Sequence, residues 1–267
     1  MPVKSNRKLD SQKEKQLLPI LWELLKKNID DVEFEPTNDI SEQLAGSDFK
    51  MKSPTIFGDF EYHVIDAKAA TDYIAVVGRD RGLPTFAMEL ASTQRQEYRE
   101  GWAINNKGYY SKTEYFLFQW VFAKNNSREI SKENISHIEI MIVPKDKLLN
   151  FIKNPTEFVN GNFPNFREKL DNDKVKALYD FMKYFYTKIK GIRHEDGPIP
   201  LKNNDLLHLK KGRLYLNLLN PKGQLTKEPR IVYTSKDIKQ EQPMNIVIWK
   251  KPYLNDLSIY TCILKNI

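Results

Sequence analysis

The stretch from Glu114 to Ala123 is almost continuously apolar and aromatic, and it constrains the fold more than any other part of the sequence. An apolar run of this length could be a buried strand or part of a buried helix. Its aromatic and β-branched content favours a strand that is covered on both faces. We therefore expect this strand to lie in the centre of a sheet.

Apolar spacing divides the first two-thirds of the chain into helices and strands. It predicts helices at 11–28, 40–45, 145–152 and 172–190. It predicts further strands at 49–52, 60–67, 85–90 and 138–143. Pro19 lies inside the first helix, so we expect a kink or a separate first turn there. This order is typical of an α/β or α+β fold with a central mixed β-sheet flanked by helices.

The pattern of apolar and turn residues changes after Gly191. Short strand-like runs separated by turn residues follow, at 213–219, 230–234, 245–250 and 257–264. We therefore expect a core domain of residues 1–191 and a β-rich C-terminal extension of residues 192–267. The extension could be a small subdomain of its own, or it could add strands to the main sheet.

The charge and cysteine content narrow the class of protein. The net charge is +7, and a basic surface attracts polyanions, although lysine-rich composition also occurs without a nucleic-acid partner. The single cysteine, Cys262, cannot form an internal disulfide, which fits a reducing compartment. The chain has no apolar run near the ~20 residues of a membrane helix and no signal-like start. We expect a cytoplasmic protein without a membrane partner.

The triplet Asp66-Ala67-Lys68 carries the most informative chemistry. On a strand, Asp66 and Lys68 project from the same face because side chains alternate. The carboxylate can bind a hard cation such as Mg²⁺, which polarises a phosphate and lowers the pKa of a bound water. The lysine can orient that water or stabilise charge that develops on the phosphate. Such a triplet is common by chance, so its context decides its meaning.

A second acid is needed beside Asp66, because one carboxylate rarely holds Mg²⁺ alone. Asp48 is the best candidate, since it starts the preceding strand and a hairpin-like return would bring it next to Asp66. Asp59 and Glu61 are rivals on spacing. Glu89 lies on a later strand and could join as a third acid.

These residues resemble the PD-(D/E)xK, or restriction-endonuclease-like, nuclease superfamily, and in particular its uncharacterised phage and bacterial members. The resemblance covers roughly residues 10–150. It is carried by Asp48, by Asp66 and Lys68 in the run 65–69, and by the segments 85–89, 101–102 and 113–115. Ser47 stands where the motif of the superfamily has proline before the first acid.

The resemblance implies a restriction-endonuclease-like core encoded by a bacterium or phage. Asp48 and Asp66 would bind Mg²⁺, with Mn²⁺ as a substitute, Lys68 would assist the attacking water, and Glu89 would be an auxiliary acid. DNA is the implied partner, because most of the family acts on DNA. Restriction-type cutting of both strands often uses a symmetric homodimer, which stays open here.

Several other residues have both a functional and a structural interpretation. Glu14 or Glu23 on the first helix could add an acid to the site, but a solvent-facing glutamate is the default. Gln43 could position water or substrate, or be an ordinary helix residue. Gln94 and Tyr98 match a small motif of some of these nucleases by a spacing that also arises by chance. His63 faces away from Asp66, and the histidines and the single cysteine offer no zinc site.

Cations and aromatic residues alternate in the last third of the chain. Cations that neutralise phosphates supply most of the non-specific affinity for nucleic acid, and aromatic rings can stack on bases. The alternative is a β-surface that carries lysine for solubility and to blunt sheet edges. The candidate nucleic-acid-binding residues are Lys210, Lys211, Arg213, Arg230, Lys250 and Lys251.

The leading hypothesis is therefore a Mg²⁺-dependent DNA endonuclease. Two other classes remain open. A catalytically inactive nucleic-acid-binding protein of the same fold would bind in a salt-sensitive way without cleavage. A structural or interaction protein, in which Asp66 and Lys68 form a plain ion pair, would not bind nucleic acid at physiological salt.

Overall fold

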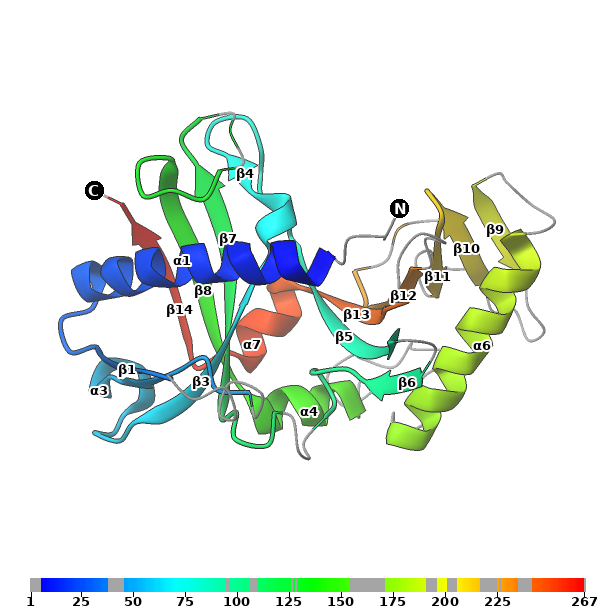
Figure 1. The fold of residues 1–267 in the computed structure, drawn as a ribbon, viewed down its shortest axis with the longest axis horizontal. Coiled ribbons are helices and arrows are strands. Elements are labelled where there is room, and N and C mark those ends of the chain that lie inside the picture. Colours follow the sequence, from blue (N-terminus) through cyan, green and yellow to red (C-terminus); the bar gives the residue numbers. More distant parts are fainter. Residues whose placement is uncertain are drawn as a thin grey trace. The chain divides into compact units, whose positions relative to one another are not determined.

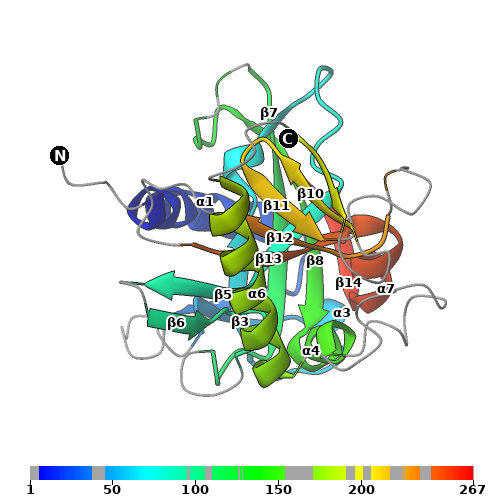
Figure 2. The ribbon, with the colours of Figure 1, turned by 90° about the vertical axis from the view of Figure 1, so that its right-hand side faces the viewer.

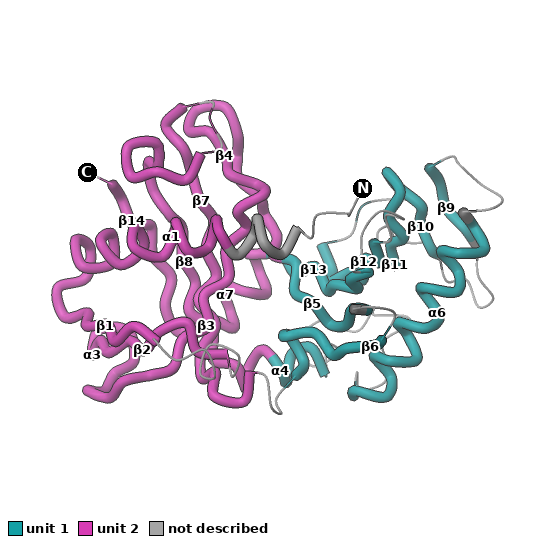
Figure 3. Tube along the Cα trace, in the orientation of Figure 1, with its two compact units in different colours: residues 1–4, 87–105, 149–249 teal, residues 5–86, 106–148, 250–267 magenta. Residues whose placement is uncertain are grey.

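The computed structural model forms two compact units that interleave along the sequence (Figure 3). Unit 1 comprises 1–4, 87–105 and 149–249, and unit 2 comprises 5–86, 106–148 and 250–267. The boundary expected after residue 191 lies inside the longest segment of unit 1, so the compact units follow a different division. The structure describes residues 6–37, 46–94, 97–105, 110–125, 127, 129–153, 171–190, 196–200, 206–216, 225, 227–234 and 242–266.

Unit 2 contains a mixed sheet with the strand order β1-β2-β3-β7-β8-β14, and β4 also pairs with β7 (Figure 1). Both β3 and β4 run parallel to β7, and the other pairs are antiparallel. The strands are β1 (Glu33–Pro36), β2 (Phe49–Lys52), β3 (His63–Ala69), β4 (Ala75–Val76), β7 (Tyr115–Ala123), β8 (Ile135–Pro144) and β14 (Tyr260–Lys265). The helical elements are α1 (Asn6–Asn28), α3 (Pro54–Phe57), η1 (Thr71–Tyr73), η3 (Lys250–Leu254) and α7 (Asn255–Leu257).

The apolar run of the sequence forms the central strand β7, which is buried from Phe116 to Ala123. One face of this strand packs against leucines of α1, including Leu17, Leu21 and Leu24, which belong to the main core. Aromatic side chains occupy the other face, where Phe86 contacts Trp120 edge to face. Burial of this strand on both faces explains why the run contains so few polar residues.

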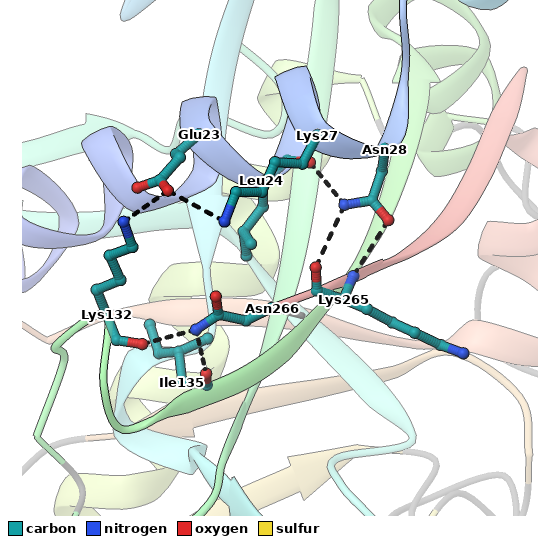
Figure 4. Close-up of polar contacts among 8 residues, drawn as sticks. All are labelled: Glu23, Leu24, Lys27, Asn28, Lys132, Ile135, Lys265 and Asn266. Carbon is teal, nitrogen blue, oxygen red and sulfur yellow. Dashed lines mark hydrogen bonds and ion pairs between the residues drawn. The ribbon is translucent and has the colours of Figure 1, made fainter.

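Helix α1 is one element that runs through Pro19, so the expected separation of its first turn is not present. Its end is tied to β14 by Asn28, whose side chain exchanges hydrogen bonds with the backbone of Lys265 (Figure 4). The side-chain Nδ2 of Asn266 donates to the carbonyls of Lys132 and Ile135, at 2.7 and 2.8 Å. These bonds tie β14 to the end of α1 and to the start of β8.

Unit 1 contains a second sheet, in the order β6-β5-β13-β12-β11-β10-β9 (Figure 2). Helix α6 packs beside it through Tyr179, whose ring lies 5.7 Å from that of Tyr233. The elements are β5 (Thr85–Gln94), β6 (Glu97–Glu100), α6 (Asn172–Lys190), β9 (Gly197–Pro200), β10 (Leu206–Lys210), β11 (Arg213–Leu216), β12 (Arg230–Thr234) and β13 (Met244–Trp249). The first two residues of β5 belong to unit 2, and α4 (Lys145–Lys153) also crosses the unit boundary.

The structure confirms a mixed α+β fold with a mixed sheet and flanking helices. In the last third of the chain, β9 to β13 form a sheet together with β5 and β6, whereas β14 pairs with β8 in the mixed sheet. The short strands β1, β6, β9 and β10 were not predicted, and the helix expected at 40–45 lies outside the described residues. None of the described helices is long and apolar enough to cross a membrane.

Candidate functional site

Asp66 and Lys68 lie side by side on β3, in the interior of unit 2. The register of the parallel pair places Asp66 opposite Phe116 and Lys68 opposite Phe118 on β7. Only 2 % of Asp66 is exposed to solvent. Lys68 Nζ lies 2.7 Å from Asp66 Oδ1, so the two side chains form a buried ion pair. The alternation of the strand therefore places the acid and the lysine together, as expected.

Asp48 reaches the same strand from its neighbour. Strand β2 pairs antiparallel with β3, with Phe49 opposite Ile65, which is the hairpin-like return that the spacing predicts. The Asp48 amide donates to the Ile65 carbonyl at 2.9 Å. Its Oδ2 accepts a 2.7 Å hydrogen bond from the amide of Ala67. The backbone between Asp66 and Lys68 thus holds the Asp48 carboxylate.

Gly46 sets the approach of the chain to Asp48. Its φ is +84°, and a Cβ there would lie 2.3 Å from Thr113 Oγ1 and 2.6 Å from the Cα of Tyr110. The Thr113 hydroxyl donates to the Gly46 carbonyl at 2.6 Å. Only glycine fits this conformation and this close contact, so the residue two before Asp48 is fixed by sterics.

Burial and the neighbouring charges strongly shift the pKa values of Asp66 and Lys68. Burial, helped by the nearby charge of Asp48 and opposed by Lys68, raises the pKa of Asp66 to about 8. Burial lowers the pKa of Lys68, but the charges of Asp66 and Asp48 outweigh it, so the pKa of this lysine is raised. The site thus favours the positively charged form of Lys68 and disfavours ionisation of Asp66. An added cation would favour the charged form of Asp66.

The oxygen atoms of this site fit a divalent cation such as Mg²⁺. Asp66 Oδ2 is buried and has no hydrogen-bond partner among the described residues, and a buried unpartnered oxygen is costly. No group of three or more Asp, Glu, His or Cys residues in the described part of the chain is arranged to hold a metal. Mg²⁺ commonly uses only one or two protein carboxylates, so Asp48 and Asp66 are the residues that would hold it.

Two residues near the pair, Lys145 and Tyr110, were missed in the sequence. The ammonium of Lys145, the first residue of α4, donates to the Tyr110 carbonyl. The negative charge of Asp66 acts to raise the pKa of Lys145, although burial lowers it more. The ring of Tyr110 lies 5.5 Å from Lys68 Nζ. Their only sequence signal is the place of Lys145 directly after Pro144, which ends β8.

A cavity of about 160 Å³ lies beside Asp48. It is lined by Glu14, Lys15, Leu17, Leu18, Asp48, Ala67, Ala69 and Gln119. Between the two acids considered on the first helix, Glu14 therefore borders Asp48, whereas Glu23 pairs with Lys27 and Lys132 (Figure 4). Gln119 Oε1 is buried and has no partner among the described residues.

The rival acids at the start of β3 have a different role. Asp59 and Glu114 both hydrogen-bond to His63, at 3.0 and 2.9 Å. Burial lowers the pKa of His63, but these two bonds outweigh it and raise the pKa. The amide of Glu61 donates to Asp59. These side chains form a cluster of their own.

The remaining candidates fall outside the site of unit 2 or outside the described residues. Glu89 belongs to unit 1, where its carboxylate accepts a 3.1 Å bond from Ser92. A role for it beside Asp48 and Asp66 stays a prediction. Tyr98 lies on β6 with its ring 5.6 Å from that of Tyr179. Gln43 lies outside the described residues.

The candidate nucleic-acid-binding cations differ in their surroundings. Lys210, Lys211 and Arg213 gather at the turn between β10 and β11, where Lys211 and Gly212 have φ of 51° and 67°. Positive φ at both positions is typical of a tight type I′ hairpin. Arg230 is half-buried on β12, and burial lowers its pKa.

The last two candidate cations lie in unit 2. Lys251 is exposed. Lys250 bonds to Glu139 and lies 4.3 Å from the centre of the Trp120 ring. Lys250 therefore contacts both an acid and an aromatic ring.

Comparison with protein-family models, with curated proteins and with solved structures found no match to this chain.

Proposed function

We propose that this protein is a metal-dependent nuclease that hydrolyses phosphodiester bonds in DNA. The observation that carries the proposal is the meeting of Asp48, Asp66 and Lys68 at one buried point of the mixed sheet. The part-buried carboxylate of Asp48 repels the buried carboxylate of Asp66, and one oxygen of Asp66 has no hydrogen-bond partner among the described residues; a bound cation would relieve both. A cluster that serves stability alone gains little from such an arrangement.

In this proposal, Asp48 and Asp66 hold Mg²⁺, with Mn²⁺ as a substitute. The bound cation supplies Lewis acidity towards the phosphate and lowers the pKa of a coordinated water. Lys68 orients the attacking water and stabilises negative charge that develops on the phosphate. The backbone amide of Ala67 keeps the Asp48 carboxylate in place.

DNA is proposed as the substrate on the strength of the family resemblance and the net charge of +7. The exposed cations at the β10–β11 turn are suited to neutralising phosphates outside the site. A restriction-type enzyme would act as a homodimer and give discrete fragments, whereas an enzyme without sequence preference would give a smear.

A second candidate function rests on the Lys68–Asp66 contact of 2.7 Å. A lysine and an acid this close can be a plain ion pair in a structural protein, or the remnant of a site in a protein that binds nucleic acid without cutting it. The binding alternative predicts salt-sensitive DNA affinity without cleavage.

Plasmid cleavage with Mg²⁺ or Mn²⁺ tests the proposal. The comparison uses wild type, Asp66→Asn, Lys68→Met and the control Glu33→Gln, which removes an acid from an exposed pair with Lys52 on the sheet edge. We expect metal-dependent cutting in wild type and in the control, and its loss in the two site variants. Folded wild-type protein that cuts neither plasmid, single-stranded DNA nor RNA in either metal would overturn the catalytic proposal.

A further inference from the structure

Lys145 is a buried cation to which the proposed reaction gives no role. It begins α4 directly after β8, and its amide donates to the Glu114 carbonyl at 2.9 Å. The Glu114 amide in turn donates to the carbonyl of Val64, two residues before Asp66 on β3. The backbone thus connects Lys145 to the strand of the acid pair through two hydrogen bonds.

The ammonium of Lys145 is only partly satisfied. It has three N–H donors, and within the described part of the chain one of them donates, to the Tyr110 carbonyl. Only 8 % of the residue is exposed, so water replaces few of the missing acceptors. Burial lowers the pKa of this lysine, and the charge of Asp66 opposes that effect. A buried ammonium with unused donors is costly unless a ligand supplies acceptors.

The neighbours of Lys145 place it at the border of the site rather than in a sealed core. The Glu114 side chain is 49 % exposed. Tyr110 is half-buried, and its ring lies beside Lys68 Nζ. Lys145 and Lys68 therefore contact the same residue, one at its carbonyl and the other at its ring.

Formal charges show what Lys145 adds. Asp48, Asp66 and Lys68 sum to −1 with both acids ionised, and a divalent cation brings this set to +1. Lys145 raises the total to +2, and two of its three N–H donors have no acceptor among the described residues. We propose that Lys145 is a second phosphate-binding residue, which contacts a non-bridging oxygen of the nucleic-acid backbone next to the acid pair. This inference rests on the proposed function, because it takes Asp48 and Asp66 as metal ligands.

The proposal predicts effects of opposite sign on two ligands. In Lys145→Met, Ca²⁺ should bind several-fold more tightly, because a cation that repels it is gone. A DNA duplex, held with Ca²⁺ in place of Mg²⁺, should bind about 10- to 100-fold more weakly, because a charge-assisted hydrogen bond is lost. A residue that only supports the local fold would weaken both ligands when replaced.

Calorimetric titration of Ca²⁺ and fluorescence anisotropy of a labelled duplex measure the two affinities. Lys147→Met is the matched control, because Lys147 is exposed on the same helix two residues further on. It should leave both affinities within about twofold of wild type, as expected of an exposed charge. Lys145→Arg keeps the charge and should retain most of the DNA affinity even where Lys145→Met folds poorly.

The outcomes separate this inference from the function on which it rests. Wild-type protein that binds no Ca²⁺ would contradict the proposed metal site itself. Wild type that binds Ca²⁺, together with Lys145→Met and Lys145→Arg proteins that bind DNA as wild type does, overturns the role of Lys145 alone. Equal weakening of Ca²⁺ and DNA binding in Lys145→Met also overturns it.

Discussion

Unit 2 contains two partly buried lysine–carboxylate pairs whose surroundings differ. The Lys250 ammonium bonds to Glu139 and stands over the ring of Trp120, and the two side chains are 15 % and 31 % exposed. The Lys68 ammonium bonds to Asp66, with side chains that are 19 % and 3 % exposed. At the second pair, Asp48 adds another carboxylate and one oxygen of Asp66 stays without a partner.

The difference distinguishes an ion pair that stabilises the fold from one that leaves a charged group for a ligand to satisfy. In the Lys250 pair, one cation meets one anion and an aromatic ring covers the cation, so no further group is required. At the Lys68 pair, the part-buried Asp48 places a like charge beside the buried Asp66, which costs free energy in the absence of a ligand. Short lysine–carboxylate distances alone do not distinguish the two cases, whereas the third charged group does.

The largest expected effect of this contrast is on cleavage. Asp66→Asn should lower the rate of metal-dependent DNA cleavage by at least about 100-fold, because a metal ligand is lost. Glu139→Gln should leave the rate near wild type and instead lower the free energy of unfolding by about 1–3 kcal/mol, because Lys250 loses its acid partner. Cleavage assays of both variants measure the rates, and urea unfolding measures the free energies of unfolding. Equal activity loss in both would remove the distinction between the pairs.

A second prediction concerns the glycine that leads to Asp48. Gly46→Ala should lower the free energy of unfolding by about 2–4 kcal/mol, because it adds both left-handed strain and a clash with Thr113 and Tyr110. Gly58→Ala is the matched control, since its φ is +80° and a Cβ there meets no atom within 4 Å. It should cost only about 1 kcal/mol. Similar midpoints of urea unfolding for the two variants would show that the approach to Asp48 is not sterically fixed.

A third prediction concerns pH. Because the pKa of Asp66 is raised to about 8 in the folded protein and is about 3.9 when unfolded, the folded state holds an extra proton between these values. The free energy of unfolding should therefore fall as pH rises from 5 to 8, by at most about 1.4 kcal/mol per unit. Thermal melts without metal should show this slope in wild type and a shallower one in Asp66→Asn. The raised pKa of His63 adds a slope of the same sign to both proteins, so their difference isolates Asp66.

The smallest effect is expected for a lysine that has no buried carboxylate beside it. Lys211 is exposed at the β10–β11 turn. Lys211→Ala should weaken DNA binding only slightly and reduce the dependence of log affinity on log salt by about one unit, which corresponds to one lost phosphate contact. Anisotropy titrations at several salt concentrations measure this slope. An unchanged slope would argue against nucleic-acid contact at this hairpin.

The local patterns that the sequence predicts best are those with a strong period or a fixed chemistry. Strands β2 and β12 and helix α6 have the expected bounds, and β7 lies in the centre of its sheet. The pairing of β2 with β3 also follows from sequence, because two short strands separated by a turn favour a hairpin. This pairing is why Asp48 and Asp66 could be named together beforehand.

The residues that sequence reasoning missed depend on contacts between distant segments. Lys145 meets Tyr110 across 35 positions, and nothing in the local pattern around either residue indicates that contact. The short strand β9 contains Pro198 and Pro200, so its strand character comes from pairing with β10. The interleaving of the two units likewise has no signal in the local sequence pattern.

Because the two units interleave, the strands of unit 2 are not all synthesised together. Residues 250–267 of unit 2 follow the whole segment 149–249 of unit 1, so at about 5–20 residues per second roughly 5–20 s pass between them on the ribosome. During this interval β8 lacks β14 as its neighbour, and Asn28 lacks the Lys265 backbone. An open strand edge recruits other chains. The nascent chain therefore exposes an aggregation-prone edge of β8, next to the central strand β7, until β14 emerges and closes it.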